Sequence, residues 1–268
     1  MRIAVIPATY NRPDMLAALF EGYLAQDYKD FEIIIADDGS GEATREVIKH
    51  YQQRAPFRIA HAWQENQGYR AGTIRNKAVA QSEADYLIFT DQDCVPRPDF
   101  LSNHQRIAER GWFVAGNRVL LAEGYTNQIL TSSDFVHDRS LTQWIYSWLR
   151  RDINRIQPLL ELPDGPWRKL HPERWHGAKT CNLAVWRDDY AAVNGMDESY
   201  SGWGLEDSDL VIRLIRAGVR HKSGRYACPL FHLWHKESSR SNLEENNRRL
   251  QQVLTSTYTR ALKGVDQY

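Results

Sequence analysis

The 268-residue chain lacks the features that mark several protein classes. Lys+Arg and Asp+Glu both number 34, so there is no basic excess to indicate nucleic acid as a partner. The three cysteines, Cys94, Cys181 and Cys228, have no paired spacing, which argues against a disulfide scaffold and favours a reducing compartment. No apolar run is long enough for a signal peptide or a membrane-spanning helix. We therefore expect a cytoplasmic protein.

Two common nucleotide-binding motifs are also missing. No G-x-G-x-x-G follows the first apolar segment, and no G-x-x-x-x-G-K-[ST] occurs anywhere. Their absence disfavours a dinucleotide-binding domain and a P-loop enzyme. Aromatic residues are plentiful by contrast, with nine Trp and 13 Tyr, and they concentrate between residues 125 and 203. Such rings suit the faces of sugars as well as protein cores.

The first 120 residues alternate between strand and helix patterns. This βαβ alternation predicts an α/β fold with a mainly parallel, doubly wound sheet, which binds ligands beyond the carboxyl ends of its strands. We expect strands at Ile3–Ile6, Phe31–Ala36, Phe57–Ala62, Tyr86–Thr90 and Phe113–Val119, and helices at Pro13–Gln26, Glu42–Gln53, Ala71–Gln81 and Pro98–Glu109.

The alternation stops at about Glu123, and we divide the single domain there. Residues 1–122 form a nucleotide-binding part, 123–176 an insertion, 177–240 an acceptor and catalytic part, and 241–268 a C-terminal segment with a helix expected at Leu243–Leu262. The insertion contains an amphipathic helix pattern with arginines around it. Packing onto the main domain is the favoured interpretation of this helix, and contact of residues 139–156 with the inner face of a membrane is the alternative.

Residues 202–209 read Gly-Trp-Gly-Leu-Glu-Asp-Ser-Asp and lead into an expected helix that Gly218 ends. On a helical wheel, Asp207 points into the apolar arc of this helix, whereas Glu206 and Asp209 fall on the other side with Arg213. We interpret Asp209 and Arg213 as a surface ion pair. A carboxylate that faces the core is costly to bury unless it has a polar partner or a catalytic role. Capping of the helix is the structural alternative to catalysis.

Two further clusters suit a divalent cation. Asp91 and Asp93 follow the apolar strand at 86–90 and point to the same side of an extended chain. His232 and His235 lie three residues apart on an expected turn. A set of carboxylates and imidazoles suits Mn²⁺ better than Mg²⁺, and zinc is less attractive without cysteine ligands.

Polar side chains near the same sheet edge suit an anionic ligand. Thr9, Asn11 and Asp38 follow the first two strands, and a helix N-terminus after Gly68 carries Arg75. A carboxylate at Asp38 could accept a hydrogen bond from a nucleobase N–H, although Asp-Gly is also a simple turn signal.

With these motifs the sequence resembles the inverting glycosyltransferases of the GT-A fold. It is similar to bacterial family 2 enzymes, with a C-terminal segment similar to that of β-1,4-galactosyltransferases and chondroitin-type polymerases. The resemblance covers about residues 1–120 and 176–237. It rests on the order of A-T-Y-N-R-P (8–13), A-D-D-G-S (36–40), G-Y-R-A-G-T-I-R-N-K-A (68–78), D-Q-D (91–93), G-W-G-L-E-D-S-D (202–209) and H-x-x-H (232–235).

The resemblance implies a role for each candidate residue. Asp207 would be the general base, with Glu206 near donor or acceptor hydroxyls. Asp93 and His235 would bind Mn²⁺ (or Mg²⁺), with His232 as a further ligand. The donor-binding set would comprise Thr9, Asn11 and Asp38 along the uridine, Gly68 and Arg75 near the ribose or diphosphate, Asp91 at the ribose or a metal-bound water, and Trp203 and Gly204 in a closing loop.

The function implied is a metal-dependent inverting glycosyltransferase. It would move a hexose or N-acetylhexosamine from a UDP-sugar to a carbohydrate or glycolipid acceptor in the synthesis of bacterial surface polysaccharide or lipopolysaccharide. A sugar-1-phosphate nucleotidyltransferase is one alternative, but that class needs a glycine-rich loop where residues 8–11 stand. A UDP-sugar- or carbohydrate-binding module without turnover is the other.

Overall fold

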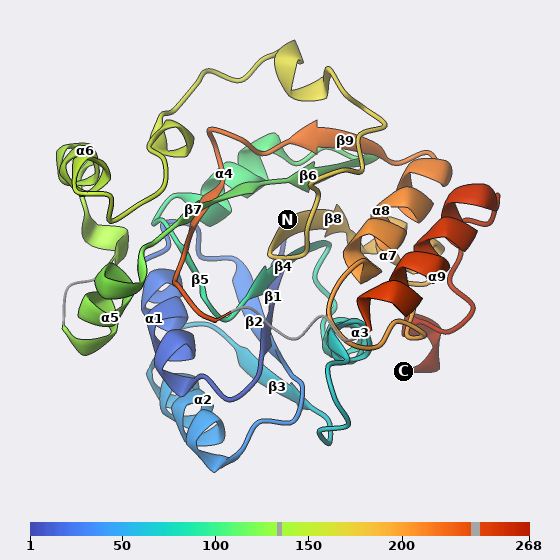
Figure 1. The fold of residues 1–268 in the computed structure, drawn as a ribbon, viewed down its shortest axis with the longest axis horizontal. Coiled ribbons are helices and arrows are strands. Elements are labelled where there is room, and N and C mark those ends of the chain that lie inside the picture. The colour runs from blue at the N-terminus through green and yellow to red at the C-terminus, as the bar shows by residue number, and fades with distance from the viewer. Residues whose placement is uncertain (133–135, 237–241) are drawn as a thin grey trace.

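The computed structural model describes residues 1–132, 136–236 and 242–268, which form an α/β fold around one large sheet (Figure 1). Its strand order is β3-β2-β1-β4-β8-β6-β9, and only the pairs that involve β8 are antiparallel among these seven strands. The predicted doubly wound, mainly parallel sheet is therefore confirmed. The strands are β1 (Ile3–Thr9), β2 (Phe31–Asp37), β3 (Ile59–Trp63), β4 (Tyr86–Asp91), β6 (Trp112–Ala115), β8 (Asn182–Trp186) and β9 (Arg220–Ser223).

Helices cover both faces of this sheet because its strands are apolar on both sides. Along β1, Ile3 and Val5 pack under one layer of helices, and Ala4 and Ile6 pack under the other. The first layer consists of α1 (Pro13–Leu24), α2 (Glu42–Arg54) and α4 (Phe100–Ile107). The second consists of α3 (Ala71–Ala80), α7 (Arg187–Ala192) and α8 (Glu206–Arg216), with α9 (Leu243–Thr255) packed outside α8.

The predicted strand Phe113–Val119 is wrong as a single element. The chain breaks at Gly116 into β6 and β7 (Asn117–Leu120), which belong to different sheets. A Cβ atom at Gly116 would collide with the Asn182 side chain, so the break is set by a tertiary contact. The second sheet has the order β5-β10-β7, with β5 at Cys94–Pro96 and β10 at Pro229–His232.

The insertion packs on this small sheet. It contains α5 (Glu123–Thr131), α6 (Leu141–Leu149) and short 3₁₀ turns at Val136–Asp138, Gln157–Leu159 and Pro166–Lys169. The Trp144 ring of α6 stacks on Phe231 of β10 at a centroid distance of 4.3 Å. Among the described residues, no helix has both the length and the apolar character needed to cross a membrane. Figure 1 shows α6 at the outer edge of the molecule.

The predicted orientation of α8 is wrong. Glu206 and Asp209 are buried, whereas Asp207 keeps partial exposure. Asp209 and Arg213 form a fully buried ion pair, not a surface pair, and Arg213 also donates to the carbonyls of Val193 and Gly195. The helical wheel predicted the wrong buried residues because α8 is covered on two sides. The large sheet covers one side, and α9 and the segment 193–200 cover the other. The predicted stop at Gly218 is confirmed by its φ of 92° and by the hydrogen bonds that close the helix.

Several predicted ends also shift by a few residues. α4 begins at Phe100 because Pro98 and Asp99 form a turn before it, and β3 begins at Ile59. The predicted C-terminal helix Leu243–Leu262 ends at Thr255, after which the chain runs back to pair with residues 193 and 194.

Candidate active site

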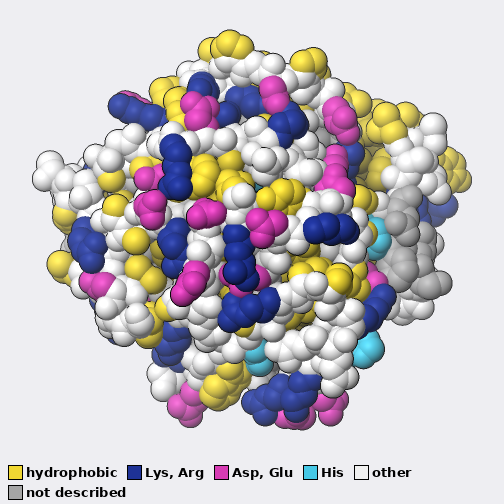
Figure 2. All heavy atoms as spheres, turned by 180° about the vertical axis from the view of Figure 1, so that it is seen from behind, with side chains coloured by type: hydrophobic (Ala, Val, Ile, Leu, Met, Phe, Trp, Pro, Cys, Tyr) yellow, Lys and Arg dark blue, Asp and Glu magenta, His cyan; other side chains and the backbone are white. Residues whose placement is uncertain are grey.

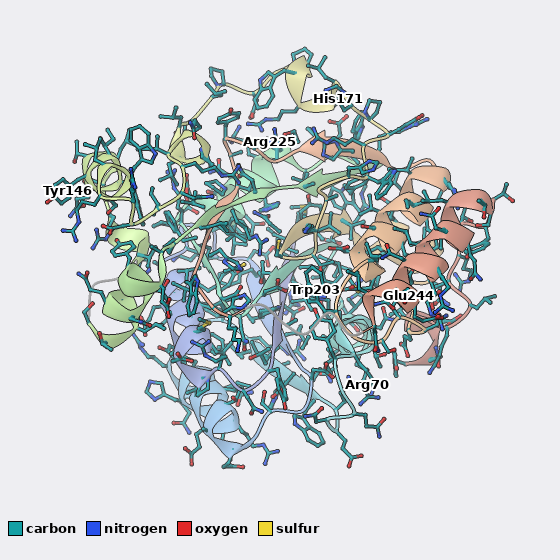
Figure 3. The ribbon with its side chains drawn as sticks, in the orientation of Figure 1. Arg70, Tyr146, His171, Trp203, Arg225 and Glu244 are labelled. Atoms are coloured by element: carbon teal, nitrogen blue, oxygen red, sulfur yellow. The ribbon has the colours of Figure 1, made fainter. Side chains whose placement is uncertain are left out.

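A pocket of about 1000 Å³ lies at the carboxyl ends of β1 and β4 and beside the small sheet. Parallel pairing aligns these strand ends, because Ala8 lies opposite Asp91 and Thr9 opposite Asp37. In Figure 3, Trp203 lies over the centre of the sheet, between α8 and the small sheet. Eight of the residues expected at the site line the pocket: Thr9, Asp38, Gly68, Asp91, Asp93, Trp203, His232 and His235.

The structure brings the candidate metal ligands together from two segments, the turn between β4 and β5 and the end of β10. His235 Nε2 lies 2.9 Å from Asp93 Oδ2, and His232 Nε2 lies 3.6 Å from the same atom. Pairing of β10 with β5 sets this geometry, since it places His232 opposite Cys94 and lets the Leu233 N–H donate to the Asp93 carbonyl. One potential ligand atom from each of Asp93, His232 and His235 lies within 4.8 Å of the others, so the set can hold one ion.

The electrostatics of this cluster favour a cation. Burial tends to raise the pKa of Asp93, but the hydrogen bond from His235 and the nearby imidazoles outweigh it and lower the pKa to about 2. The same hydrogen bond raises the pKa of His235 to about 9, whereas burial lowers the pKa of His232. A carboxylate ionised across the physiological range beside two imidazoles fits Mn²⁺ by its donor chemistry. Cys94 also lies near Asp91 and Asp93, but burial holds its pKa well above the ordinary value and keeps it a thiol.

Arg75 connects the end of β4 to the start of α8. Its side chain is 1% exposed and stands behind the pocket wall. Nη2 donates to Asp91 Oδ1 at 2.6 Å, and Nη1 lies 3.9 Å from Glu206 Oε1. Nη1 and Nε of Arg75, and Oε2 of Glu206, have no hydrogen-bond partner among the residues that the structure describes. A buried polar cluster with unfilled hydrogen-bonding capacity is suited to bind further polar groups.

The two acids at the start of α8 have unequal surroundings. Burial, and then the charge of Asp207, raise the pKa of Glu206 to about 7. Burial also raises the pKa of Asp207, against the opposing effects of Lys179 and the Ser208 N–H. A carboxylate with a raised pKa is a stronger base once ionised, so the raised pKa of each acid favours acceptance of a proton.

The turn before α8 has an unusual backbone. Gly202 and Gly204 have φ values of 71° and 102°, and Leu205 has a φ of 78°, which is strained for a residue with a side chain. The turn is held on both sides, because the Gly202 N–H donates to the Tyr69 carbonyl and Asn246 donates to the carbonyl of Gly204. Trp203 is thereby fixed in the pocket wall. Gly204, Glu206 and Asp207 are not among the residues that line the pocket.

Two of the nucleotide-binding candidates, Asn11 and Asp38, belong to the loops that follow β1 and β2. Asp38 accepts hydrogen bonds of 2.6 Å from Gln64 Nε2 and from the Arg70 N–H, and burial raises its pKa. Asn11 is not among the lining residues, and its side chain accepts from the Gly41 N–H at 2.9 Å. It therefore braces the loop beside Asp38.

Several lining residues were not predicted. Gln92 accepts hydrogen bonds from Thr9 and from the Tyr10 N–H, and Asn66 donates to the Tyr10 hydroxyl. Gln92 and Trp234 stand inside D-Q-D and H-x-x-H. Their positions between candidate ligands would have been enough to predict that they line the pocket. Ala8, Tyr10 and Arg12 belong to the A-T-Y-N-R-P motif, and Tyr69, Ala71 and Ile74 to the motif at 68–78. Local patterns gave no signal for Met15, Asn66, Arg118, Leu120, Leu121 and Lys236.

Comparison with known families finds two matches that divide the chain. The model of "Glycosyl transferase family 2" matches residues 4–160. The model described as "N-terminal domain of galactosyltransferase" matches residues 169–236, which include α8 and His232 to His235.

Curated relatives include the validoxylamine A glucosyltransferase of Streptomyces hygroscopicus subsp. jinggangensis, 27% identical over 236 residues, which cover 81% of this chain and 52% of that one. The chondroitin synthase of Escherichia coli is 25% identical over 237 residues, covering 82% of this chain and 33% of that one. The chain thus spans about half or less of the length of these two relatives.

Solved structures with a similar fold include TarS residues 1–349 from S. aureus. Its TM-score is 0.62 at 15% identity, covering 100% of this chain and 68% of that one. The mannosyltransferase PcManGT from Pyrobaculum calidifontis, solved with GDP-Man and Mn²⁺, has a TM-score of 0.59 at 16% identity and covers 93% of this chain and 61% of that one. These likenesses show the GT-A type of fold. The family 2 model matches residues 4–160, which is more than half of this chain. The chain therefore belongs to glycosyl transferase family 2.

Proposed function

We propose that this protein is a metal-dependent inverting glycosyltransferase that moves a hexose or N-acetylhexosamine from a UDP-sugar to a glycan hydroxyl. The observation that carries the proposal is the bridge from Asp91 through Arg75 to Glu206. It joins the strand end that bears the candidate metal ligand Asp93 to the helix start that bears Asp207. One site therefore contains a cation-binding cluster and a pair of acids able to take a proton.

The donor is expected to lie across the strand ends. Asp38 and its partner Gln64 stand where the uracil would bind, and Thr9 lies between them and the D-Q-D turn. S. aureus TarS has been solved with UDP and with UDP-GlcNAc, which supports a UDP-sugar as the donor class. Asp93, His232 and His235 would hold Mn²⁺ or Mg²⁺, which when bound would neutralise charge on the diphosphate.

The chain's own residues perform the proton transfer. Asp207 takes the proton of the acceptor hydroxyl while that oxygen attacks C1 of the donor sugar. The bond from C1 to the diphosphate oxygen breaks in the same step, and its electron pair leaves with UDP. Attack opposite the leaving group inverts the anomeric configuration without a covalent intermediate. Glu206 orients a sugar hydroxyl, and Trp203 covers the reacting groups.

A bacterial surface glycan, either a polysaccharide or lipopolysaccharide, is the proposed acceptor. Chondroitin synthase among the curated relatives supports a carbohydrate acceptor. A relative from Campylobacter jejuni named for a polyprenyl-linked glycan, 28% identical over 145 residues, supports a glycolipid acceptor. The buried free thiols Cys94, Cys181 and Cys228 fit a reducing cytoplasm. We infer that the protein acts there, beside the inner face of the membrane.

The test is release of UDP from a panel of UDP-sugars, each supplied with Mn²⁺, Mg²⁺ or EDTA and with sugar acceptors. The proposal expects acceptor-dependent release that EDTA abolishes. UDP binding without release under any of these conditions would establish the binding-module alternative instead. Release that EDTA leaves unchanged would remove the metal role given to Asp93, His232 and His235.

A further inference from the structure

Helix α6 presents an apolar face that nothing in the described part of the chain covers. Only Trp144 and Ser147 of its nine residues are buried. Leu141, Ile145, Trp148 and Leu149, spaced i, i+4, i+7 and i+8, share a second side of the helix and are 42–68% exposed. Tyr146 continues this side and points outward in Figure 3. These five residues form the α6 face.

Arginines flank the α6 face, although the whole chain is neutral. Residues 139–155 contain four arginines and one acid, Asp152. Arg150 lies over the Tyr146 ring and pairs with Asp152 at 3.3 Å, while Arg151 is exposed and Arg155 is held by a hydrogen bond to the Arg118 carbonyl. Figure 2 shows hydrophobic and Lys or Arg side chains together along the edge on the α6 side, whereas the remaining visible surface mixes both charges.

The α6 face continues to the mouth of the pocket. The chain after α6 pairs with the end of β7, because the Asn154 N–H donates to the Leu120 carbonyl and the Ala122 N–H donates to that of Asp152. Leu120 and Leu121 line the pocket, and Leu120 is 41% exposed. The stack of Trp144 on Phe231 also fixes α6 relative to His232, the next residue of β10. Any partner surface that contacts α6 would therefore lie beside the mouth of the pocket.

We propose that the α6 face, with Arg150 and Arg151, docks the protein on an anionic lipid bilayer. Apolar side chains enter the interfacial zone, aromatic rings sit at the headgroups, and arginines attract anionic lipids. Such a site orients the pocket toward a glycolipid acceptor. This orienting role rests on the proposed function, but the lipid contact itself is independent of it.

The size of the α6 face argues against a second copy of the chain as its occupant. Its five side chains, each of roughly 200 Å² and 42–68% exposed, together offer about 500 Å² of accessible surface. A stable dimer buries about 800 Å² on each partner. A bilayer has no such requirement, because shallow insertion and charge attraction act together.

An environment-sensitive NBD label on Leu149→Cys tests the contact, with Leu262→Cys as the matched control. Both side chains are exposed, and the native thiols are buried and shielded from the label. Vesicles of phosphatidylcholine with phosphatidylglycerol should shift the emission of the label at position 149 to shorter wavelength, whereas phosphatidylcholine alone should not. The control position should not respond. An equal response at both positions, or at neither, overturns the proposal.

Co-sedimentation with the same vesicles measures the charge contribution. Arg150→Ser with Arg151→Ser should reduce the bound fraction about tenfold or more, whereas Arg248→Ser with Arg249→Ser on α9 should leave it unchanged. About 0.5 M salt should release the wild type. A concentration-dependent dimer that is lost on Leu149→Ser, without vesicle binding, would assign the face to a second copy. UDP release in solution is assayed separately, so its failure would not affect the lipid result.

Discussion

Arg75 Nη2 donates to Asp91 Oδ1 at 2.6 Å from a guanidinium that is almost completely buried. The bond joins α3 to the end of β4, and the second arm of the same guanidinium faces Glu206 at 3.9 Å. Burial of one arginine among several acids is stable only while their charges offset one another. Arg75 therefore couples the donor side of the site to the acids of α8.

Arg75→Met should damage both folding and transfer. It leaves Asp91 and Glu206 without their cation, at an expected cost of about 2–4 kcal/mol in unfolding free energy, since Asp91 is partly exposed. Transfer should fall by about 100-fold or more, because Glu206 and Asp207 lose their position. Urea unfolding and UDP release measure the two effects. Arg75→Lys should recover most of the stability but little of the activity, and equal recovery of both would contradict a positioning role.

Asp207→Asn should retain UDP binding and lose transfer by about 10²–10⁴-fold, because the amide cannot take the acceptor proton. Titration with UDP and the release assay separate the two properties. Asp188→Asn is the matched control, because Asp188 is 81% exposed in the first turn of α7 and should be neutral in both assays. Full transfer by Asp207→Asn would remove Asp207 as the base.

Much of the fold follows from patterns that a short stretch of sequence contains. The strands from Ile3 to Asp91 are apolar on both faces, and their alternation with helices is enough to predict a parallel sheet and a site at its edge. D-Q-D and H-x-x-H predict Asp93 and His235 as metal ligands, because ligands recur at short spacing. The structure brings the two together through the pairing of β10 with β5.

The misjudged features depend on contacts between distant segments. Asp209 was placed on the surface because a wheel assumes one buried side, but α8 is buried on two. Gly116 ends β6 only because the Asn182 side chain occupies the space that a side chain there would need. Gln64 reaches Asp38 from a different strand end, and no spacing along the chain links the two.

Gly202→Ala should destabilise the turn that holds Trp203. Its φ of 71° is strained for alanine, and the new Cβ would lie 2.7 Å from Asn242 Cβ. The expected cost is about 1–3 kcal/mol, with a lower kcat/KM for transfer. Gly111→Ala is the control, because Gly111 has a φ of 77° but no atom within 4 Å of a Cβ built there. If both variants lose equal stability and activity, the contact with Asn242 plays no part.

Removal of metal should abolish transfer, and changes to the ligands should alter the metal requirement. His235→Gln should raise the Mn²⁺ concentration needed for half-maximal activity by about tenfold or more. It should also remove the rise in Tm that Mn²⁺ gives the wild type. His50→Gln, at an exposed histidine on α2, should change neither value. An unchanged Mn²⁺ requirement in His235→Gln would leave Asp93 and His232 as the candidate ligands.

The pKa of Glu206 near 7 predicts how stability changes with pH. The folded protein holds the Glu206 proton up to about pH 7, whereas the unfolded chain releases it near pH 4.5. Folding therefore binds a proton between these values, and the contribution of Glu206 to stability is present below pH 4.5 and lost as the pH rises to 7. The loss is on the order of 3 kcal/mol.

Glu206→Gln removes this titration. The unfolding free energy of the variant should therefore rise relative to that of the wild type between pH 4.5 and 8, and the difference should be constant above pH 8. Urea unfolding of both proteins across this range measures the difference. A difference that does not change with pH would mean that Glu206 is ionised throughout, and it would then be an electrostatic partner of Arg75, not a proton-binding group.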